Sequence, residues 1–391
     1  MNSRAPIFIF ANDPWNNYWQ TRHHIAYRLA ERGWPVSYTR NIFNRWDISY
    51  EAWETSTWFL KRERVDNIVF FWPGRLHTTL ANSRTWAMYL RRHQLNRMLN
   101  DTASAQNGRP IVYVFHPSFA DYLELFDGFK VIYHADDTFS AMPGWNNQLA
   151  QQERTLVKRA DIIIASSQLM ASSLPLIENK PVTIIPNGAD SHAFSNAGGE
   201  PVPKILSAIP APRIGYIGTI NDKVDLPLLA NIATARPDWH WCIAGHVVPL
   251  KYFRSDNMAA LERCRSLNNV HFLGAYPTNQ LPSLVNHMNV NTLIYRTIGS
   301  GWWKNVSPLK LHEYLATGLP VVSADVDSVR EFGAVVDIAN SQPDWIDAID
   351  RAISGLGMGS PTLRRKVAFE NDWNERVDRI EKLLKELITA G

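Results

Sequence analysis

The chain has 391 residues, of which 45% are hydrophobic and 20% charged, and its formal net charge is +3. This length allows two domains with separate cores, the composition is globular rather than disordered, and the small charge excludes a global nucleic-acid-binding signal. The sequence favours a cytoplasmic protein that is soluble or peripheral on a membrane. It has two cysteines without metal-ligand spacing, no signal peptide and no apolar run of ~18 residues.

The first half of the chain alternates strand and helix patterns, which is typical of a parallel sheet covered by helices. Apolar strands are predicted at residues 6–10, 35–38, 68–72, 111–115, 131–133, 162–165 and 182–185. Amphipathic helices are predicted at residues 19–32 and 148–159. Residues 195–204 have the Gly/Pro-rich composition of a linker, so we predict an N-terminal domain over residues 1–195.

The second half repeats this α/β pattern, and we predict a C-terminal domain over residues 205–370. Strands are predicted at residues 213–217, 239–244, 270–273, 290–295 and 320–323. Helices are predicted at residues 226–235 and 373–387.

Residues 307–323 are the most informative stretch of the chain. Ser307 is a good N-cap, Pro308 suits the first helical position and Gly318 ends the predicted helix. Lys310 places a cation in the first turn, where the helix dipole disfavours it by roughly 0.3–1 kcal/mol. Because free N–H groups at a helix N-terminus attract anions, an added lysine makes a phosphate site. A well-capped helix with a solvated lysine is the alternative.

This stretch resembles the nucleotide-sugar signature of GT-B glycosyltransferases, in particular family 4 (glycosyl transferases group 1). The resemblance implies two Rossmann-like, doubly wound α/β domains facing a central cleft, with the acceptor bound by the first and the nucleotide sugar by the second. It also implies that residues 371–391 form a helix that returns to the N-terminal domain. Lys310 would face the donor diphosphate and Glu313 would hold the ribose hydroxyls. Asn305 stands where many relatives have another glutamate.

Further donor-binding residues are predicted beyond the carboxyl ends of strands, where open parallel sheets bind ligands. Gly218 and Thr219 follow the strand at 213–217, and a glycine there lets backbone N–H groups approach a phosphate closely. An ordinary turn is the alternative. Lys223 could add a second charge, and a solvated loop lysine is its alternative. The set is completed by Tyr295, Ser307 and Leu309.

Candidate catalytic and acceptor-side residues follow strands of the first half. Asp137 matches the strand-end aspartate of xanthan-type inverting glucuronosyltransferases, and a carboxylate there could deprotonate an acceptor hydroxyl. His116 matches the histidine that binds the transferred sugar in family 4 enzymes. Both residues could instead serve ordinary turns. Acceptor-side residues are predicted on or after the first loop at Asn12, Asp13 and Arg22.

Residues 61–98 are rich in Lys, Arg and aromatic side chains. A basic, aromatic amphipathic helix suits an anionic membrane surface, whereas a solvated helix face is the plain alternative. The segment contains no RNA-binding motif, so no nucleic-acid partner is predicted.

We therefore predict a hexosyltransferase (EC 2.4) that moves sugar from a UDP-sugar to a lipid-linked saccharide or polysaccharide precursor in bacterial exopolysaccharide or cell-surface glycan synthesis. No Asp-x-Asp motif follows a strand in the first half, which predicts metal-independent transfer without a cofactor. The family resemblance favours retention of the anomeric configuration, whereas Asp137 as base would invert it. An epimerase of the same fold and a non-catalytic subunit of a polysaccharide assembly complex are the alternatives.

Overall fold

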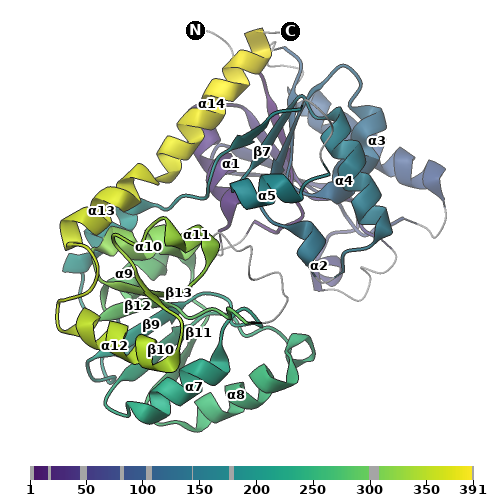
Figure 1. The fold of residues 1–391 in the computed structure, drawn as a ribbon. Helices are drawn as coiled ribbons and strands as arrows, with labels where there is room; N and C mark the ends of the chain where they lie inside the picture. The colour runs from purple at the N-terminus through teal and green to yellow at the C-terminus, as the bar shows by residue number, and fades with distance from the viewer. Residues whose placement is uncertain are drawn as a thin grey trace. The chain divides into compact units, whose positions relative to one another are not determined.

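The computed structural model describes residues 4–15, 19–44, 51–79, 83–102, 108–142, 144–175, 180–298 and 308–389. The chain divides into two compact units (Figure 1): unit 1 comprises Met1–Pro186 and Val377–Gly391, and unit 2 comprises Asn187–Arg376. The predicted linker at 195–204 lies inside unit 2. It continues from helix α6 (Ser191–Asn196), which packs against helix α10 (Leu309–Thr317), through a 3₁₀ turn at Ala197–Gly199.

Unit 1 is built on an eight-stranded sheet in the order β3-β4-β2-β1-β5-β6-β7-β8. All neighbouring strands are parallel except β3, which pairs antiparallel with β4. The strands are β1 (Ile7–Phe10), β2 (Val36–Thr39), β3 (Lys61–Val65), β4 (Ile68–Trp72), β5 (Ile111–Val114), β6 (Lys130–Ala135), β7 (Ile162–Ala165) and β8 (Val182–Ile184). The seven strands predicted in this half are confirmed, whereas β3 was not predicted.

Helices cover both faces of this sheet: Figure 1 shows α1 and α14 on one side and α3 and α4 on the other. The α-helices of unit 1 are α1 (Thr21–Glu31), α2 (Glu51–Glu54), α3 (Arg84–Thr102), α4 (Asn147–Arg159), α5 (Gln168–Ser173) and most of α14 (Trp373–Thr389). Two 3₁₀ helices, η3 (Pro117–Leu125) and η4 (Phe139–Ala141), follow β5 and β6. The core under α3 and α4 joins Phe8, Val112 and Tyr133 of the sheet to Met98 and Leu156 of the helices.

Unit 2 is built on a six-stranded, wholly parallel sheet in the order β11-β10-β9-β12-β13-β14. Counted within the unit, this is the 3-2-1-4-5-6 order of the doubly wound fold. The strands are β9 (Arg213–Ile217), β10 (His240–Ala244), β11 (Val270–Gly274), β12 (Val290–Leu293), β13 (Val321–Ala324) and β14 (Asp337–Ala339). The remaining helices of this unit are α7 (Leu226–Ala235), α8 (Ser255–Ser266), α9 (Leu281–Asn286), α11 (Asp327–Arg330), α12 (Gln342–Ile353) and α13 (Pro361–Glu370), with short 3₁₀ turns at Ala197–Gly199, Lys204–Leu206, Leu250–Tyr252 and Thr278–Gln280.

Helix α10 confirms the helix predicted after Ser307, with a correction at its start. It begins at Leu309, and Pro308 is its N-cap rather than its first helical residue, because the ψ of 112° at Pro308 is extended. Gly318 ends the helix in the left-handed conformation with a φ of 79°, as predicted. Ser307 and Asn305 lie outside the described residues.

None of the helices that the structure describes is both long and apolar enough to cross a membrane.

Candidate functional site

The strand order reverses once in each sheet, between β1 and β5 in unit 1 and between β9 and β12 in unit 2. At such a switch point the loops beyond the carboxyl ends of the two strands diverge and leave a crevice for ligands. Gly218 follows β9 and Tyr295 follows β12, whereas Asn12 follows β1 and His116 follows β5. The two sheets therefore each bring predicted site residues to their own switch point.

Lys310, in the first turn of α10, places its ammonium at the switch point of unit 2. Its Nζ lies 4.2 Å from the centre of the Tyr216 ring and 5.8 Å from that of Tyr295, and within the described residues it has no hydrogen-bond partner. Burial lowers the pKa of Lys310 well below its usual value, and the charge of Lys223 lowers it further. Since the ring faces only partly replace water around a cation, the site is suited to an anion.

Gly218 allows the backbone to lie directly against this ammonium. Its φ of 147° is one that residues with side chains rarely adopt, and a Cβ built there would lie 1.9 Å from Lys310 Nζ. The Gly218 N–H donates to Ala244 O at 2.7 Å, and the Tyr216 hydroxyl donates to Thr219 O at 3.0 Å. The loop after β9 is thus fixed beside the lysine, with Thr219 exposed.

Helix α10 is fixed against β9 by a tyrosine. The Tyr314 hydroxyl oxygen accepts a hydrogen bond from Ile217 N at 2.8 Å, which sets how α10 lies against the strand. Glu313, one turn from Lys310, has its pKa raised to about 7 by burial, and the nearby lysine opposes that rise. Leu309, the first helical residue, is half-buried. The helix therefore presents a cation and a titratable carboxyl close to each other.

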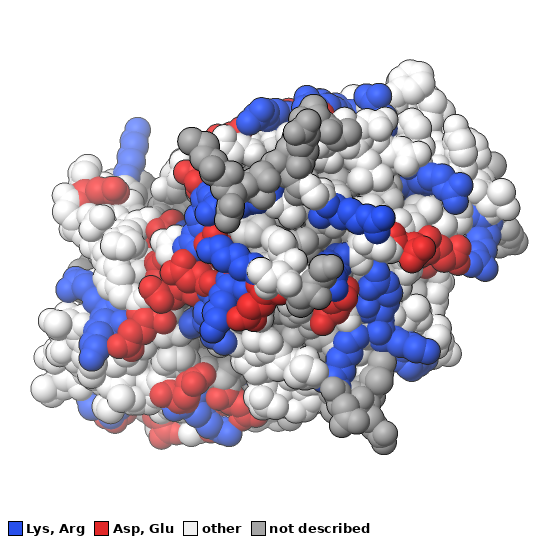
Figure 2. Space-filling view, turned by 90° about the horizontal axis from the view of Figure 1, so that it is seen from above, with Lys and Arg blue, Asp and Glu red and all other residues white. Residues whose placement is uncertain are grey.

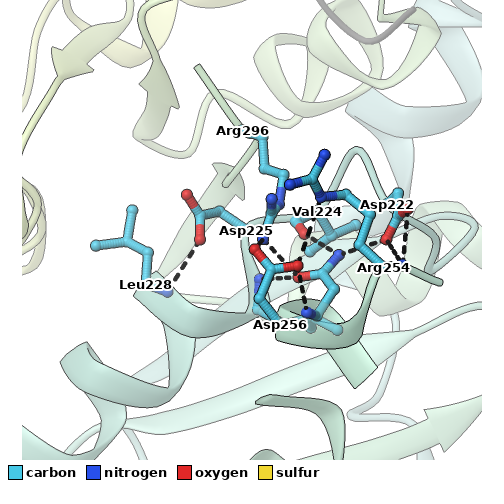
Figure 3. A network of polar contacts seen from close by, with 9 residues as sticks. Asp222, Val224, Asp225, Leu228, Arg254, Asp256 and Arg296 are labelled. Carbon is cyan, nitrogen blue, oxygen red and sulfur yellow. Dashed lines mark hydrogen bonds and ion pairs between the residues drawn. The ribbon is translucent and has the colours of Figure 1, made fainter. Parts of the chain in front are cut away.

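A polar network that was not predicted joins the two loops of this site (Figure 3). Arg296, just after Tyr295, donates from Nη2 to Asp256 Oδ2 at 2.6 Å, and its backbone N–H donates to Lys223 O at 2.8 Å. Asp222 accepts from the Arg254 N–H at 3.0 Å. These contacts hold the backbone of the loop, and Lys223 Nζ lies 5.7 Å from the centre of the Tyr295 ring.

In unit 1 the predicted acceptor-side and catalytic residues line one cavity of about 400 Å³ at the switch point. We call it the switch-point cavity. Its walls include the aromatic side chains of Phe115, Phe139 and Trp145. All five residues predicted for this side line it, namely Asn12, Asp13, Arg22, His116 and Asp137.

Arg22 organises the charges of the switch-point cavity. It forms ion pairs with Asp13 and with Asp136, the latter at 2.8 Å from Nη1 to Oδ2. The Asp136 side chain is only 3% exposed, and its Oδ1 has no partner within the described residues. Burial raises the pKa of Asp136 to about 7, against the opposing charge of Arg22. The sequence assigned no role to Asp136, whereas Asp137 beside it is exposed and lines the cavity.

His116 is held as a neutral hydrogen-bond donor. Its Nδ1 accepts from Ser118 N at 3.1 Å, so the ring proton of the neutral form sits on Nε2. Burial lowers the pKa of His116 to about 4, and the ring packs edge-on against Phe139 at 4.8 Å. This tautomer suits a contact with a sugar hydroxyl rather than proton abstraction.

Asn12 serves mainly to connect loops. Its Nδ2 donates to Ser118 Oγ at 3.3 Å, and its Oδ1 accepts from Asn41 N at 3.3 Å. It therefore ties the loop after β1 to the loops after β2 and β5.

The basic aromatic segment 61–98 is not one helix. Lys61–Val65 forms the edge strand β3, because its charged, exposed side chains suit a strand at a sheet edge. Many of its cations are paired within the protein, as in Lys61–Glu63 at 2.8 Å, Arg62–Asp101 at 2.5 Å and Arg91–Asp121 at 2.7 Å. Figure 2 likewise shows basic and acidic side chains interspersed on one face of the molecule.

Part of the chain matches a known protein family, and most of it is similar to a named relative. Residues 211–354 match the family described as glycosyl transferases group 1. The chain is 26% identical over 302 residues to a Bacillus subtilis protein named as the teichuronic acid biosynthesis glycosyltransferase TuaH, covering 72% of this chain and 74% of that one.

Solved structures share the whole fold at low sequence identity. Sucrose-phosphate synthase from Thermosynechococcus elongatus superposes with a TM-score of 0.72 at 15% identity, covering 99% of this chain and 100% of that one. Anabaena HepE in complex with UDP and glucose gives a TM-score of 0.69 at 13% identity, covering 98% and 100%.

The fold and these comparisons define the class: the protein is a glycosyltransferase with the GT-B fold. More particularly, its unit 2 carries a group 1 glycosyltransferase domain at residues 211–354.

Proposed function

We propose that the protein transfers a sugar from a nucleotide diphosphate sugar, most simply a UDP-sugar, to a saccharide acceptor bound at the switch-point cavity. One observation carries the donor half of the proposal. The buried Lys310 ammonium, beside Gly218 and the first turn of α10, has no hydrogen-bond partner within the described residues. The complex of HepE with UDP and glucose supports UDP as the nucleotide.

In this proposal the leaving diphosphate is stabilised by protein groups, without a metal ion. Lys310 and Lys223 supply positive charge, and free N–H groups of the first turn of α10 supply hydrogen bonds. Glu313 accepts hydrogen bonds from the ribose hydroxyls. Tyr295, Leu309 and Thr219 line the donor. We propose retention of the anomeric configuration, which the configuration of the product tests directly.

In the switch-point cavity His116 would donate from Nε2 to a hydroxyl of the transferred sugar. Asp137 would accept a hydrogen bond from a hydroxyl of the acceptor other than the attacking one, while Arg22 and Asp13 hold the acceptor ring. In the retaining transfer the proton of the attacking hydroxyl would pass to an oxygen of the leaving diphosphate. These roles agree with the neutral tautomer of His116 and with the exposure of Asp137.

The acceptor that we propose is a lipid-linked saccharide or polysaccharide precursor in the synthesis of a bacterial surface glycan. The likeness to TuaH, whose name refers to teichuronic acid biosynthesis, supports this class. Such an acceptor would place the protein at the inner face of the plasma membrane. The exposed aromatic rings of Trp86 and Tyr89 on α3, which are 37% and 59% exposed, support contact with that anionic surface.

The donor half is tested by calorimetric titration of the full chain with UDP, GDP, ADP and dTDP and their sugars, with and without Mg²⁺. We expect one nucleotide family to bind in both conditions. Lys310→Ala should weaken its binding by about 10–100-fold, the worth of a charge-assisted hydrogen bond. Lys251→Ala is the matched control, because Lys251 is an exposed lysine over the Tyr252 ring in the same unit.

Three outcomes would contradict the proposal in different ways. Equal affinity of Lys310→Ala and wild type would refute the donor site. Conversion of the nucleotide sugar without any acceptor would identify an epimerase. Absence of binding to every nucleotide would indicate a non-catalytic subunit.

A further inference from the structure

A second cavity of about 360 Å³ lies in unit 1, at the edge of the sheet that carries β3 and β4. We call it the edge cavity. Its lining comes from β3, β4, the segment after α2 and the loops after β1 and β2. None of the predicted donor, acceptor-side or catalytic residues lines it.

Aromatic rings form the floor of the edge cavity. The antiparallel register sets Lys61 opposite Trp72 and Glu63 opposite Phe70, so these four side chains share one face of the sheet. The Phe70 and Trp72 rings stack with centroids 5.1 Å apart, and the Trp15 ring lies 5.0 Å from Phe70. Trp15 and Trp72 are only half-buried, so their rings remain available for contact.

Charged groups stand beside these rings. Lys61 and Glu63 form an ion pair at 2.8 Å, with side chains 48% and 39% exposed, and Arg40 also lines the cavity. Such charged walls do not suit the binding of an apolar lipid chain. A sugar ring fits both parts, because its C–H face packs on an aromatic ring while its hydroxyls bond to charged side chains.

One short loop separates the two cavities of unit 1. Asn12 and Asp13 line the switch-point cavity, and the next two residues, Pro14 and Trp15, line the edge cavity. The loop is held on both sides: Tyr38 donates to Asp13 O at 3.2 Å, and His23 Nε2 lies 3.1 Å from Pro14 O. A saccharide of several units that reacts at the first cavity can therefore continue past Pro14 into the second.

We propose that the edge cavity binds a sugar unit of the acceptor remote from the unit that reacts, with Trp72 and Trp15 as stacking platforms and Glu63 as a hydrogen-bond acceptor. This inference rests on the proposed function. It makes the enzyme selective for oligosaccharide acceptors over single sugars.

The test uses the full chain saturated with UDP and a microarray of defined bacterial surface oligosaccharides, from monosaccharides to hexasaccharides. We expect at least one series in which binding rises about tenfold with chain length. Trp72→Leu keeps an apolar side chain but removes the ring, and it should abolish the rise in binding with chain length. Glu63→Gln changes an exposed side chain outside the core, and it should reduce the rise several-fold. Tyr252→Leu is the control, because Tyr252 is an exposed aromatic residue of unit 2 and lines neither cavity of unit 1.

The outcomes separate the two proposals. Two results would overturn the edge-cavity inference alone. One is binding that rises with oligosaccharide length as in wild type in both Trp72→Leu and Glu63→Gln; the other is a wild-type chain that binds UDP but no oligosaccharide. Absence of binding of every nucleotide to the wild-type chain would overturn the proposed function and this inference with it.

Discussion

Lys310 is the residue whose charge depends most directly on a ligand. Its ammonium lies over the Tyr216 ring and meets no hydrogen-bond acceptor of the described residues, and burial lowers its pKa well below the usual value. A diphosphate would bring negative charge to the same place and raise that pKa again. Binding of the donor is therefore coupled to uptake of a proton.

We predict that the affinity for UDP falls as the pH rises through the alkaline range. Because the pKa of Lys310 is lowered by burial and a bound diphosphate would raise it again, the free protein loses this proton at a lower pH than the complex does, and binding at higher pH must take up a proton. Glu313, whose pKa is raised to about 7, is already ionised at alkaline pH and contributes little to the slope there. Calorimetry in two buffers of different ionisation enthalpy measures the uptake directly. Lys310→Arg, which stays charged, should show none; equal uptake in that variant would contradict the prediction.

The sequence alone could indicate the functional role of some of these residues but not of others. Lys310 stands out because a cation in a first helical turn breaks a local rule, and such breaks occur at functional sites. Asp136 could not be given its role in this way, because its partner Arg22 is 114 positions away. Arg296 is also hidden, since its contacts with Asp256 and Lys223 depend on how separate loops fold together.

At the level of elements, the loops after β9 and β12 act as a pair. Arg296 links them, because one residue both binds Asp256 by its side chain and holds Lys223 by its backbone N–H. These contacts tie residues 222–225 to residues 295–296, and Figure 3 shows how closely their polar groups gather.

We predict that Arg296→Met weakens UDP binding about threefold to tenfold. The lost hydrogen bonds to a charged partner are worth about 1–2 kcal/mol, and the loop that carries Lys223 becomes less well positioned. Arg265→Met is the control, because Arg265 forms an exposed ion pair with Glu262 on α8, away from both loops. Affinity equal in the two variants would show that the network does not position the donor loop.

Most strands could be predicted, because parallel strands buried on both faces appear as short apolar runs. Two strands were not predicted, β3 and β14, and each lies at the edge of its sheet. The sequence of β3 is KRERV, and such charges are tolerated at a sheet edge. Its antiparallel pairing with β4 depends on the turn at Asp66, whose φ is 51°. The edge cavity could not be foreseen for the same reason, since its floor exists only once that register is known.

At the scale of the whole molecule, α14 is secured to unit 1 by a buried carboxylate. Glu381 accepts from Trp34 Nε1 at 3.0 Å and pairs with Arg4 and Arg32, each at 3.2 Å. Val377, Ile380 and Leu384 on the same helix are fully buried. The end of the chain is thus part of the fold of unit 1.

We predict that Glu381→Ala destabilises unit 1 by about 1–3 kcal/mol, because it leaves the buried indole N–H of Trp34 without its acceptor and removes the ion pairs with Arg4 and Arg32. Urea unfolding followed by circular dichroism should show a transition at lower urea, with UDP affinity of the folded protein unchanged. Asp378→Ala, which removes a 59% exposed partner of Arg32, should cost less than about 1 kcal/mol. Similar losses in both variants would refute the anchoring role.

The path of the chain has a consequence for engineering. Because unit 1 takes both the first and the last part of the chain, unit 2 is a single insert whose ends are Asn187 and Arg376. Two junctions are therefore enough to exchange it. On the proposed function, a chimaera that receives the corresponding segment of a relative would take that relative's nucleotide-sugar specificity while it keeps the switch-point and edge cavities, so that donor and acceptor preferences could be recombined as modules.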